Sequence, residues 1–318
     1  MWPIGIDKIK RLQIELTTFC NADCPSCERA KYTTGSIYKR QLNSVHMSFE
    51  SLQKWLPLSD MKSLKRINFC GNIDEPTLHP ELYEICEWLD KYDVYISTNG
   101  GTRNIKFWEK LPELRNVRVI FGIDGLEDTN HIYRKNVRWK KLHQNYTAYI
   151  KKGGQAMWQF ILFDHNKHQL DEAREKSIEE GFVSFNTIYS SRENFEVEAV
   201  EKKREKETCV KCKATYDNHD LGYTSLYIDV RGNVWPCCWM ASNDTANYDV
   251  APKTNFGHFL AHNLNYDTFQ DIIEGDMFSY LWDNLHQFEV CNLHCKENIT
   301  DTITWKGSYV DRNTQYSR

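Results

Sequence analysis

Residues 16–27, which read LTTFCNADCPSC, decide how the rest of the chain is interpreted. They hold Cys20, Cys24 and Cys27 at the spacing C-x3-C-x2-C, directly after a short apolar run. Thiolates this close in sequence can converge on one metal centre, and a cubane [4Fe–4S] cluster held by three cysteines keeps one iron free for another ligand. The alternatives are a zinc site whose fourth ligand is distant in sequence, and thiols without a metal.

Composition places the chain among ordinary globular proteins. Its 318 residues suffice for two domains, and 41% hydrophobic with 26% charged residues is typical of a folded chain. The net charge of −4 gives no support for nucleic acid or an anionic membrane as a partner, and no apolar run approaches the ~18 residues of a membrane span. Eleven cysteines without an export signal favour metal ligation over disulfides, so a cytoplasmic protein is expected.

Strand-like and helix-like segments alternate through the first half of the chain. The expected strands are residues 11–17, 66–70, 94–97, 117–123, 156–163 and 182–188, and the expected helices are residues 48–56, 80–92, 104–111, 139–152 and 169–180. Connections of this length imply parallel strands with right-handed crossovers, in an open sheet or a partial barrel. In both architectures the loops at the carboxyl ends of the strands form one site.

The loops at those strand ends carry distinctive residues: the cysteine loop, GNIDEP at 71–76, STNGG at 97–101 and GIDG at 122–125. Together they resemble the radical S-adenosylmethionine (SAM) family. The resemblance implies an incomplete (β/α)6 TIM-like barrel and a [4Fe–4S] cluster whose open iron is chelated by SAM. It also implies that SAM is reductively cleaved to a 5′-deoxyadenosyl radical, which abstracts a hydrogen atom from a substrate C–H bond.

The resemblance also implies which residues contact SAM. Glu75 matches the position that accepts hydrogen bonds from the SAM ammonium group. Asp74 is a rival for that role, because three residues separate Gly71 from Glu75 where the family has a tight Gly-Gly-Glu. Thr98 and Asn99 match the position after the third strand that contacts the methionine or ribose portion.

Asp124 matches the acidic residue that ends the fourth strand in this family, and Arg134 is expected to pair with the SAM carboxylate. Two positions depart from the family pattern: Gly122 stands where serine is usual, and Ser26 stands where an aromatic residue commonly packs against adenine. Adenine packing must then come from another side chain, for which the sequence offers Phe19, Tyr32 and Phe160.

Six further cysteines follow a densely charged stretch, which we expect to be an exposed connector at residues 196–208. They are Cys209, Cys212, Cys237, Cys238, Cys291 and Cys295, with a β-hairpin expected before Cys237. Their order is similar to the auxiliary-cluster domains named SPASM and twitch. Six cysteines are too few for two fully cysteine-ligated clusters, so one further [4Fe–4S] cluster is expected, with structural zinc as the alternative.

The expected ligands of this second cluster are Cys212, Cys237, Cys291 and Cys295, with Cys209 and Cys238 as alternates. The predicted organisation is therefore a radical SAM partial barrel at 1–195, the connector at 196–208, and a small α+β auxiliary-cluster domain at 209–318. The whole is an α/β protein.

The resemblance predicts an oxidoreductase-like enzyme that receives single electrons from an external donor of flavodoxin or ferredoxin type. Modification of a peptide or protein is expected first, although the first strand starts too early to leave room for an N-terminal leader-binding domain. The alternatives are oxidation or rearrangement of a sugar, cyclitol or nucleotide, and a non-catalytic iron–sulfur or zinc protein. Cys70, at the end of the second strand, is a candidate hydrogen donor or else a buried apolar side chain.

Overall fold

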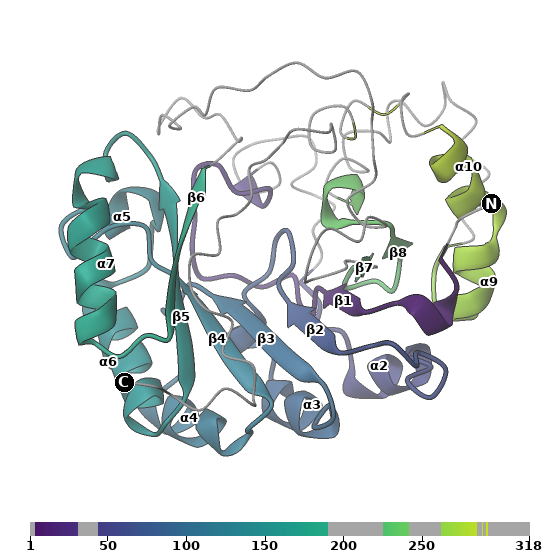
Figure 1. Ribbon diagram of the computed structural model, residues 1–318, viewed down its shortest axis with the longest axis horizontal. Helices are drawn as coiled ribbons and strands as arrows, with labels where there is room; N and C mark the ends of the chain where they lie inside the picture. The colour runs from purple at the N-terminus through teal and green to yellow at the C-terminus, as the bar shows by residue number, and fades with distance from the viewer. Residues whose placement is uncertain are drawn as a thin grey trace.

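The computed structural model describes residues 4–30, 44–189, 225–241, 262–284, 288 and 291. Within them the chain forms an eight-stranded sheet in the order β6-β5-β4-β3-β2-β1-β7-β8. Strands β1 to β6 are joined side by side in chain order, and each adjacent pair is parallel. The sheet curves as an open, partial barrel, which confirms the predicted fold class (Figure 1).

All six strands of the predicted barrel are present, each within a few residues of its expected bounds. They are β1 (Arg11–Ile14), β2 (Arg66–Phe69), β3 (Asp93–Thr98), β4 (Val117–Gly122), β5 (Gln155–Leu162) and β6 (Ser184–Tyr189). Because all six run in the same direction, their carboxyl ends meet at one rim of the sheet.

Helices connect these strands and cover the outer face of the sheet (Figure 1). They are α2 (Phe49–Trp55), α3 (Leu82–Trp88), α4 (Ile105–Lys110), α6 (Trp139–Lys151) and α7 (Leu170–Glu179). The Ser48 hydroxyl caps α2 by accepting a hydrogen bond from the Ser51 amide, so this pair of serines is sufficient for a cap. Helix α3 begins two residues later than Pro80, and a 3-10 turn, η3 (Pro76–Leu78), precedes it.

One short helix, α5 (Asn130–Tyr133), was not predicted. It has only four residues, too few for hydrophobic periodicity to register, and it is the next helix in the chain after β4. Its importance is positional, because Arg134 follows it and is thereby held above the end of β4. Three further 3-10 turns lie elsewhere: η1 (Ile6–Lys8), η4 (Leu111–Glu113) and η5 (Lys167–Gln169).

The second half of the chain contributes β7 (Ser225–Ile228), β8 (Val234–Trp235), α9 (Phe269–Glu274) and α10 (Asp276–Asp283). Strands β7 and β8 are antiparallel and form the predicted hairpin. Strand β7 also pairs in parallel with β1, so the hairpin extends the barrel sheet, which the sequence did not indicate. The predicted connector at 196–208 lies outside the described residues.

The two faces of the barrel strands differ in character. The outward faces carry fully buried apolar side chains such as Leu12, Phe69, Val119 and Phe160, which belong to the main core under the helices. On the inward face, Tyr95, Ile120 and Met157 form a separate small cluster. Among the described residues, no helix is both long and apolar enough to cross a membrane.

Candidate active site

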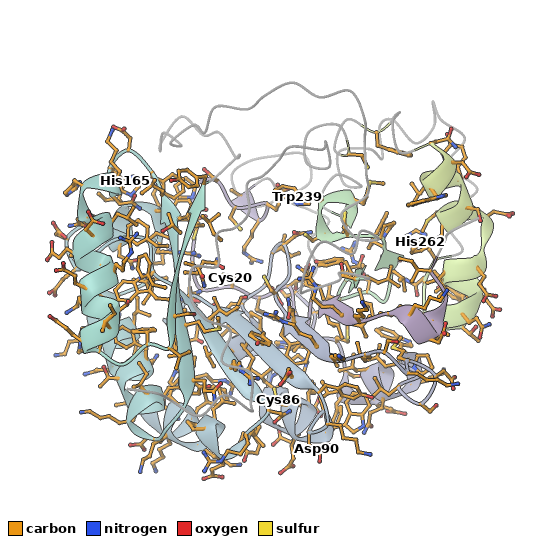
Figure 2. All side chains as sticks on the ribbon, in the orientation of Figure 1. Cys20, Cys86, Asp90, His165, Trp239 and His262 are labelled. Carbon is orange, nitrogen blue, oxygen red and sulfur yellow. The ribbon has the colours of Figure 1, made fainter. Side chains whose placement is uncertain are left out.

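A cavity of about 340 Å³ lies where the carboxyl ends of the barrel strands meet. Figure 2 shows Cys20 near the middle of the molecule at this rim, with Trp239 of the second half above it. Most of the predicted site residues line the cavity: Cys20, Cys24, Cys27, Cys70, Asp74, Glu75, Thr98, Asn99 and Arg134. The topology therefore brings together side chains that are more than 100 residues apart in the sequence.

The three thiols of the cysteine loop border this cavity in a low-polarity environment. Burial raises the pKa of Cys20, and it raises the pKa of Cys24 to about 12 although the Arg134 charge opposes the shift. A desolvated thiolate needs a positive partner, which the irons of a cluster provide.

The arrangement of the described His, Cys, Asp and Glu side chains indicates which kind of metal centre fits. No three of them are placed to hold a single metal ion in the parts of the chain that the structure describes. A zinc–thiolate site would need sulfurs about 3.8 Å apart, at Zn–S distances near 2.3 Å. In a cubane each of three thiolates binds a different iron, and the fourth iron stays open to another ligand. The three thiols of the cysteine loop, which border one cavity, fit such a cluster.

Glu75 is buried at the centre of a hydrogen-bond network beside the thiols. Its Oε1 accepts hydrogen bonds from the Thr77 hydroxyl at 2.6 Å and the Thr98 hydroxyl at 2.5 Å, and its Oε2 accepts one from the Asn99 amide at 2.7 Å. Burial raises the pKa of Glu75, while these donors oppose the shift. A carboxylate oxygen offers two lone pairs, so Oε2 can accept a further hydrogen bond, and Glu75 lines the cavity.

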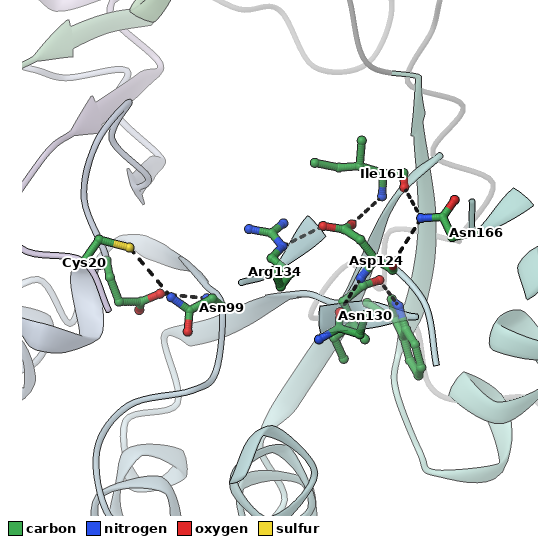
Figure 3. Close-up of polar contacts among 10 residues, drawn as sticks. Cys20, Asn99, Asp124, Asn130, Arg134, Ile161 and Asn166 are labelled. Atoms are coloured by element: carbon green, nitrogen blue, oxygen red, sulfur yellow. Dashed lines mark hydrogen bonds and ion pairs between the residues drawn. The ribbon is translucent and has the colours of Figure 1, made fainter. Parts of the chain in front are cut away.

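Asn99 connects this network to the cysteine loop. Its Nδ2 lies 3.9 Å from Cys20 Sγ (Figure 3) and donates a hydrogen bond to Asn21 Oδ1 at 2.8 Å. Its Oδ1 accepts a hydrogen bond from the Gly101 amide at 2.8 Å. Asn21 was not singled out from the sequence, although its position directly after Cys20 was a usable signal. These contacts fix the loop relative to the end of β3.

Asp124 lies behind the cavity wall, fully buried, and is held on both oxygens. Its Oδ2 forms an ion pair with Arg134 Nε at 2.6 Å, and its Oδ1 accepts a hydrogen bond from the Ile161 amide at 2.6 Å (Figure 3). Burial raises the pKa of Asp124, and the Arg134 charge opposes that shift. Asp124 thus orients Arg134, and Arg134 is the member of the pair that reaches the cavity.

Gly122 explains how Arg134 fits at the end of β4. A Cβ atom at this position would lie 2.5 Å from Arg134 Nη2. The guanidinium therefore occupies the space that the family's usual serine would fill, which accounts for this departure from the pattern.

Neither of the two described candidates for adenine packing lines the cavity. Phe160 is fully buried and packs on Phe185 with ring centroids 5.9 Å apart, because its position on β5 faces the helices. Phe19 stacks on His46 at 4.6 Å instead. The third candidate, Tyr32, lies outside the described residues. From β5 the cavity receives the neighbouring inward side chains Gln159 and Ile161.

Cys70 and Asp74 both line the cavity, but their surroundings differ. Asp74 accepts hydrogen bonds from the Gly71 amide at 2.7 Å and the Leu16 amide at 3.3 Å, so it anchors its own loop to β1. The Cys70 carbonyl accepts a hydrogen bond from Gln13 Nε2 at 2.6 Å. Cys70 lines the cavity, so its predicted role as a hydrogen donor stays a proposal.

Three of the six C-terminal cysteines are described. Cys237 and Cys238 lie just after β8, beyond Pro236, and Cys291 is buried with its Sγ 3.9 Å from Met240 Sδ. Cys209, Cys212 and Cys295 lie outside the described residues, so the ligand set of the second cluster stays a prediction. Trp239, which lines the cavity, was missed because no spacing rule links it to the barrel.

Comparisons with known proteins agree with this geometry. The family model described as the radical SAM superfamily matches residues 14–179, and one described as an iron–sulfur cluster-binding domain matches residues 220–296. A curated protein of Methanocaldococcus jannaschii, described as 7,8-dihydro-6-hydroxymethylpterin dimethyltransferase, is 26% identical over 145 residues. The match covers 44% of this chain and 27% of that protein, so the chain spans about a quarter of its curated relative.

Solved structures share the fold at low sequence identity. SuiB of Streptococcus suis bound to the precursor peptide SuiA has a TM-score of 0.60 at 14% identity, covering 88% of this chain and 67% of SuiB. BtrN in complex with AdoMet and 2-DOIA has a TM-score of 0.52 at 15% identity, covering 94% of this chain and 97% of BtrN.

The first family match extends over more than half of the 318 residues, and the cavity residues lie where its chemistry requires them. The cofactors of this chain are accordingly a [4Fe–4S] cluster and SAM, with an auxiliary iron–sulfur cluster in the second half. The chain belongs to the radical SAM superfamily and is an enzyme that carries a C-terminal iron–sulfur cluster-binding domain of SPASM type.

Proposed function

We propose that this enzyme modifies a side chain of a peptide or protein by removing a hydrogen atom from one of its C–H bonds. The observation that carries the proposal is the small volume of the cavity. Its volume of about 340 Å³ lies at the lower end of the range for drug-sized ligands. Because Cys20, Cys24 and Cys27 line the same cavity, a cluster and SAM would fill most of it, so only one group of a large substrate would enter and the remainder would stay outside.

The apolar part of the cavity wall suits an inserted side chain. It is formed by Ile161, Ile188, Tyr189 and Trp239, from β5, β6 and the second half of the chain. Apolar and aromatic walls exclude water and bind side chains through buried area. Support also comes from SuiB, which was solved with a precursor peptide bound and covers most of this chain.

The chain's own residues have distinct roles in this proposal. Cys20, Cys24 and Cys27 hold the cluster; bound together, the cluster and SAM supply the abstraction of a hydrogen atom from an unactivated C–H bond. The free acceptor position on Glu75 Oε2 receives the SAM ammonium, and Arg134, oriented by Asp124, receives the SAM carboxylate. Thr98 and Asn99 fix Glu75, and an external flavodoxin or ferredoxin supplies the electrons.

A small-molecule substrate is the second candidate function. BtrN, solved with AdoMet and 2-DOIA, matches this chain over 97% of its own length, so a chain of this extent accommodates such a substrate. The curated relative named for a pterin substrate supports the same alternative. A sugar, cyclitol or other cyclic compound would then occupy the space that we assign to a side chain.

The deciding experiment measures 5′-deoxyadenosine formed by the anaerobically reconstituted, reduced enzyme with SAM. Peptides encoded beside its gene form one set of candidates, and amino sugars, cyclitols and pterins form the other. We expect 5′-deoxyadenosine to rise about tenfold or more with one peptide, together with a mass change in that peptide. A rise restricted to a small molecule would contradict the peptide proposal and establish the alternative.

The variant Cys24→Ala tests the cluster assignment. We expect it to lose roughly four irons per chain and all SAM cleavage, while retaining the auxiliary cluster. Iron and sulfide analysis with electron paramagnetic resonance of the reduced protein measures both properties. Cys86→Ala, which changes a buried thiol in α3, is the matched control and should keep both clusters. Retained SAM cleavage in Cys24→Ala would refute the assignment.

A further inference from the structure

A buried carboxyl group and a half-buried one meet beside the cavity at the end of β2. They belong to Glu15, just beyond β1, and to Asp74, in the loop after β2. The position that a Gly71 Cβ would occupy lies 2.7 Å from Glu15 Cδ and 2.6 Å from Asp74 Oδ1. The two carboxyl groups are therefore separated by no more than the sum of these distances. Only glycine at position 71 leaves the space in which they approach each other.

The hydrogen bonds around the two groups differ. Asp74 accepts from two backbone amides, those of Gly71 at 2.7 Å and Leu16 at 3.3 Å, which favours its ionised form. Glu15 Oε2 accepts from the Tyr227 hydroxyl and from the Asn72 amide, the latter at 3.1 Å. Asp74 lines the cavity, whereas Glu15 is 3% exposed and lies behind it.

Two carboxyl groups this close, one of them buried, do not both ionise readily near neutral pH. Burial and the neighbouring charge raise the pKa of Asp74; burial raises the pKa of Glu15 to about 7 although the Tyr227 hydrogen bond opposes the shift. The other charged groups that face the pair are Glu75, Asp229 and Arg231, of which only Arg231 is positive. The pair therefore carries one proton and one negative charge.

We propose that Asp74 is a catalytic residue that accepts a proton from the substrate, and that Glu15 is the positioning residue that keeps the second proton of the pair. The proposal rests on the proposed function above. In the step, an N–H or O–H bond of the substrate next to the reacting carbon breaks. Its electron pair stays on the nitrogen or oxygen, and the proton forms an O–H bond on Asp74, which later releases it to water.

The placement of the pair supports a role in the reaction rather than in folding alone. The three residues between Gly71 and Glu75 lengthen this loop beyond the family pattern and put Asp74 on the cavity wall. The same loop contacts the second half of the chain, where Asn72 Nδ2 donates to the Cys238 carbonyl at 2.9 Å. The loop that carries Asp74 thus contacts both the cavity and the second half of the chain.

The test compares wild type, Asp74→Asn and Glu15→Gln in two assays, with the peptide identified by the deciding experiment. One assay measures peptide-dependent 5′-deoxyadenosine and the other measures modified peptide. We expect Asp74→Asn to form as much peptide-dependent 5′-deoxyadenosine as wild type, but to form modified peptide about 100-fold or more slowly. Glu15→Gln replaces the protonated Glu15 carboxyl by a neutral amide of similar shape, so it should keep activity and lose the inflection in the pH profile near 7, to which burial raises the pKa of Glu15. Asp171→Asn, on the surface of α7, is the control and should match wild type.

Each other outcome overturns the proposal. Loss of both products in Asp74→Asn would show that Asp74 binds SAM, and unchanged amounts of both would show that it takes no part. An inflection near pH 7 that persists in Glu15→Gln would show that Glu15 does not hold the proton of the pair. If wild type forms no peptide-dependent 5′-deoxyadenosine, the proposed function fails instead, and proton sharing is judged from the protein without substrate.

That substrate-free measurement is thermal stability against pH. The pKa of Glu15 is raised on folding, so its stabilising contribution is complete below about pH 4.5 and is lost as pH rises through about 7. The melting temperature of wild type should therefore fall relative to that of Glu15→Gln between pH 5 and pH 8. Parallel curves for the two proteins would overturn the shared proton.

Discussion

At the scale of single residues, the site depends on a few glycines, because a larger residue would occupy the space of a neighbouring side chain. Gly122 is the clearest, because the Arg134 guanidinium lies where its Cβ would be, and Arg134 in turn compensates the buried charge of Asp124. An isolated buried carboxylate is costly, so the ion pair and the glycine act as a unit. The sequence has glycine where the family usually has serine, but only the contact with Arg134, twelve positions later, explains that glycine.

Gly122→Ser should therefore destabilise the protein by displacing Arg134 from Asp124. We expect a loss of roughly 1–3 kcal/mol in the free energy of unfolding, measured by urea denaturation. The control is the same substitution in an Arg134→Gln background, where it should cost clearly less because the clash is gone. Equal costs in the two backgrounds would show that Gly122 acts independently of Arg134.

At the scale of elements, the two faces of β5 serve different purposes. Phe160 is fully buried and packs under the helices, whereas Ile161, one residue along, lines the cavity. Side chains of a strand alternate between its faces, so adjacent residues contribute to different parts of the protein. From the sequence, Phe160 was a candidate for adenine packing, because the pattern of residues in β5 does not reveal which face of the strand points toward the cavity.

Alanine substitutions on β5 should separate stability from binding. Phe160→Ala should cost about 3–5 kcal/mol of unfolding free energy and leave the SAM affinity of the folded fraction unchanged. Ile161→Ala should cost less, roughly 1–2 kcal/mol, and weaken SAM or substrate binding. Urea denaturation and equilibrium dialysis with SAM measure the two effects. Equal changes in binding for both variants would contradict the assignment of the two faces.

At the scale of the whole molecule, the two halves of the chain share one sheet. Strand β7 pairs with β1 over four residues, all its side chains are buried, and Tyr227 bonds to Glu15. A barrel without β7 would expose the edge of β1 and an apolar surface beside it. We therefore expect a chain ended at Tyr189 to aggregate or to bind a dye specific for exposed apolar surface, as measured by light scattering and dye fluorescence.

The full-length protein, treated identically, is the control for this truncation. A monomeric fragment with the melting temperature of the full chain would show that the barrel is an independent domain, as the predicted boundary at residue 195 implies. A single cooperative unfolding transition of the full-length protein, together with a fragment that does not fold, would show instead that pairing between β1 and β7 joins the two halves into one folding unit.

Local patterns in the sequence determined the order of strands and helices, the three clustered cysteines and the loops at the strand ends. These features depend on neighbours in the chain: side-chain period, caps such as Ser48, and thiols spaced within eight residues. The gathering of Glu75, Thr98, Asn99 and Arg134 followed from parallel pairing, which places the carboxyl ends of the strands at one rim.

Only the tertiary structure decided the remaining features. Strand β7 lies beside β1, Trp239 reaches the cavity from the second half, and Gly71 lets Glu15 and Asp74 approach each other. Each involves partners brought together from separate strands or loops, so no periodicity or motif records it. The pKa values of the two carboxyl groups follow from the same cause, because burial and a neighbouring charge exist only after the chain has folded.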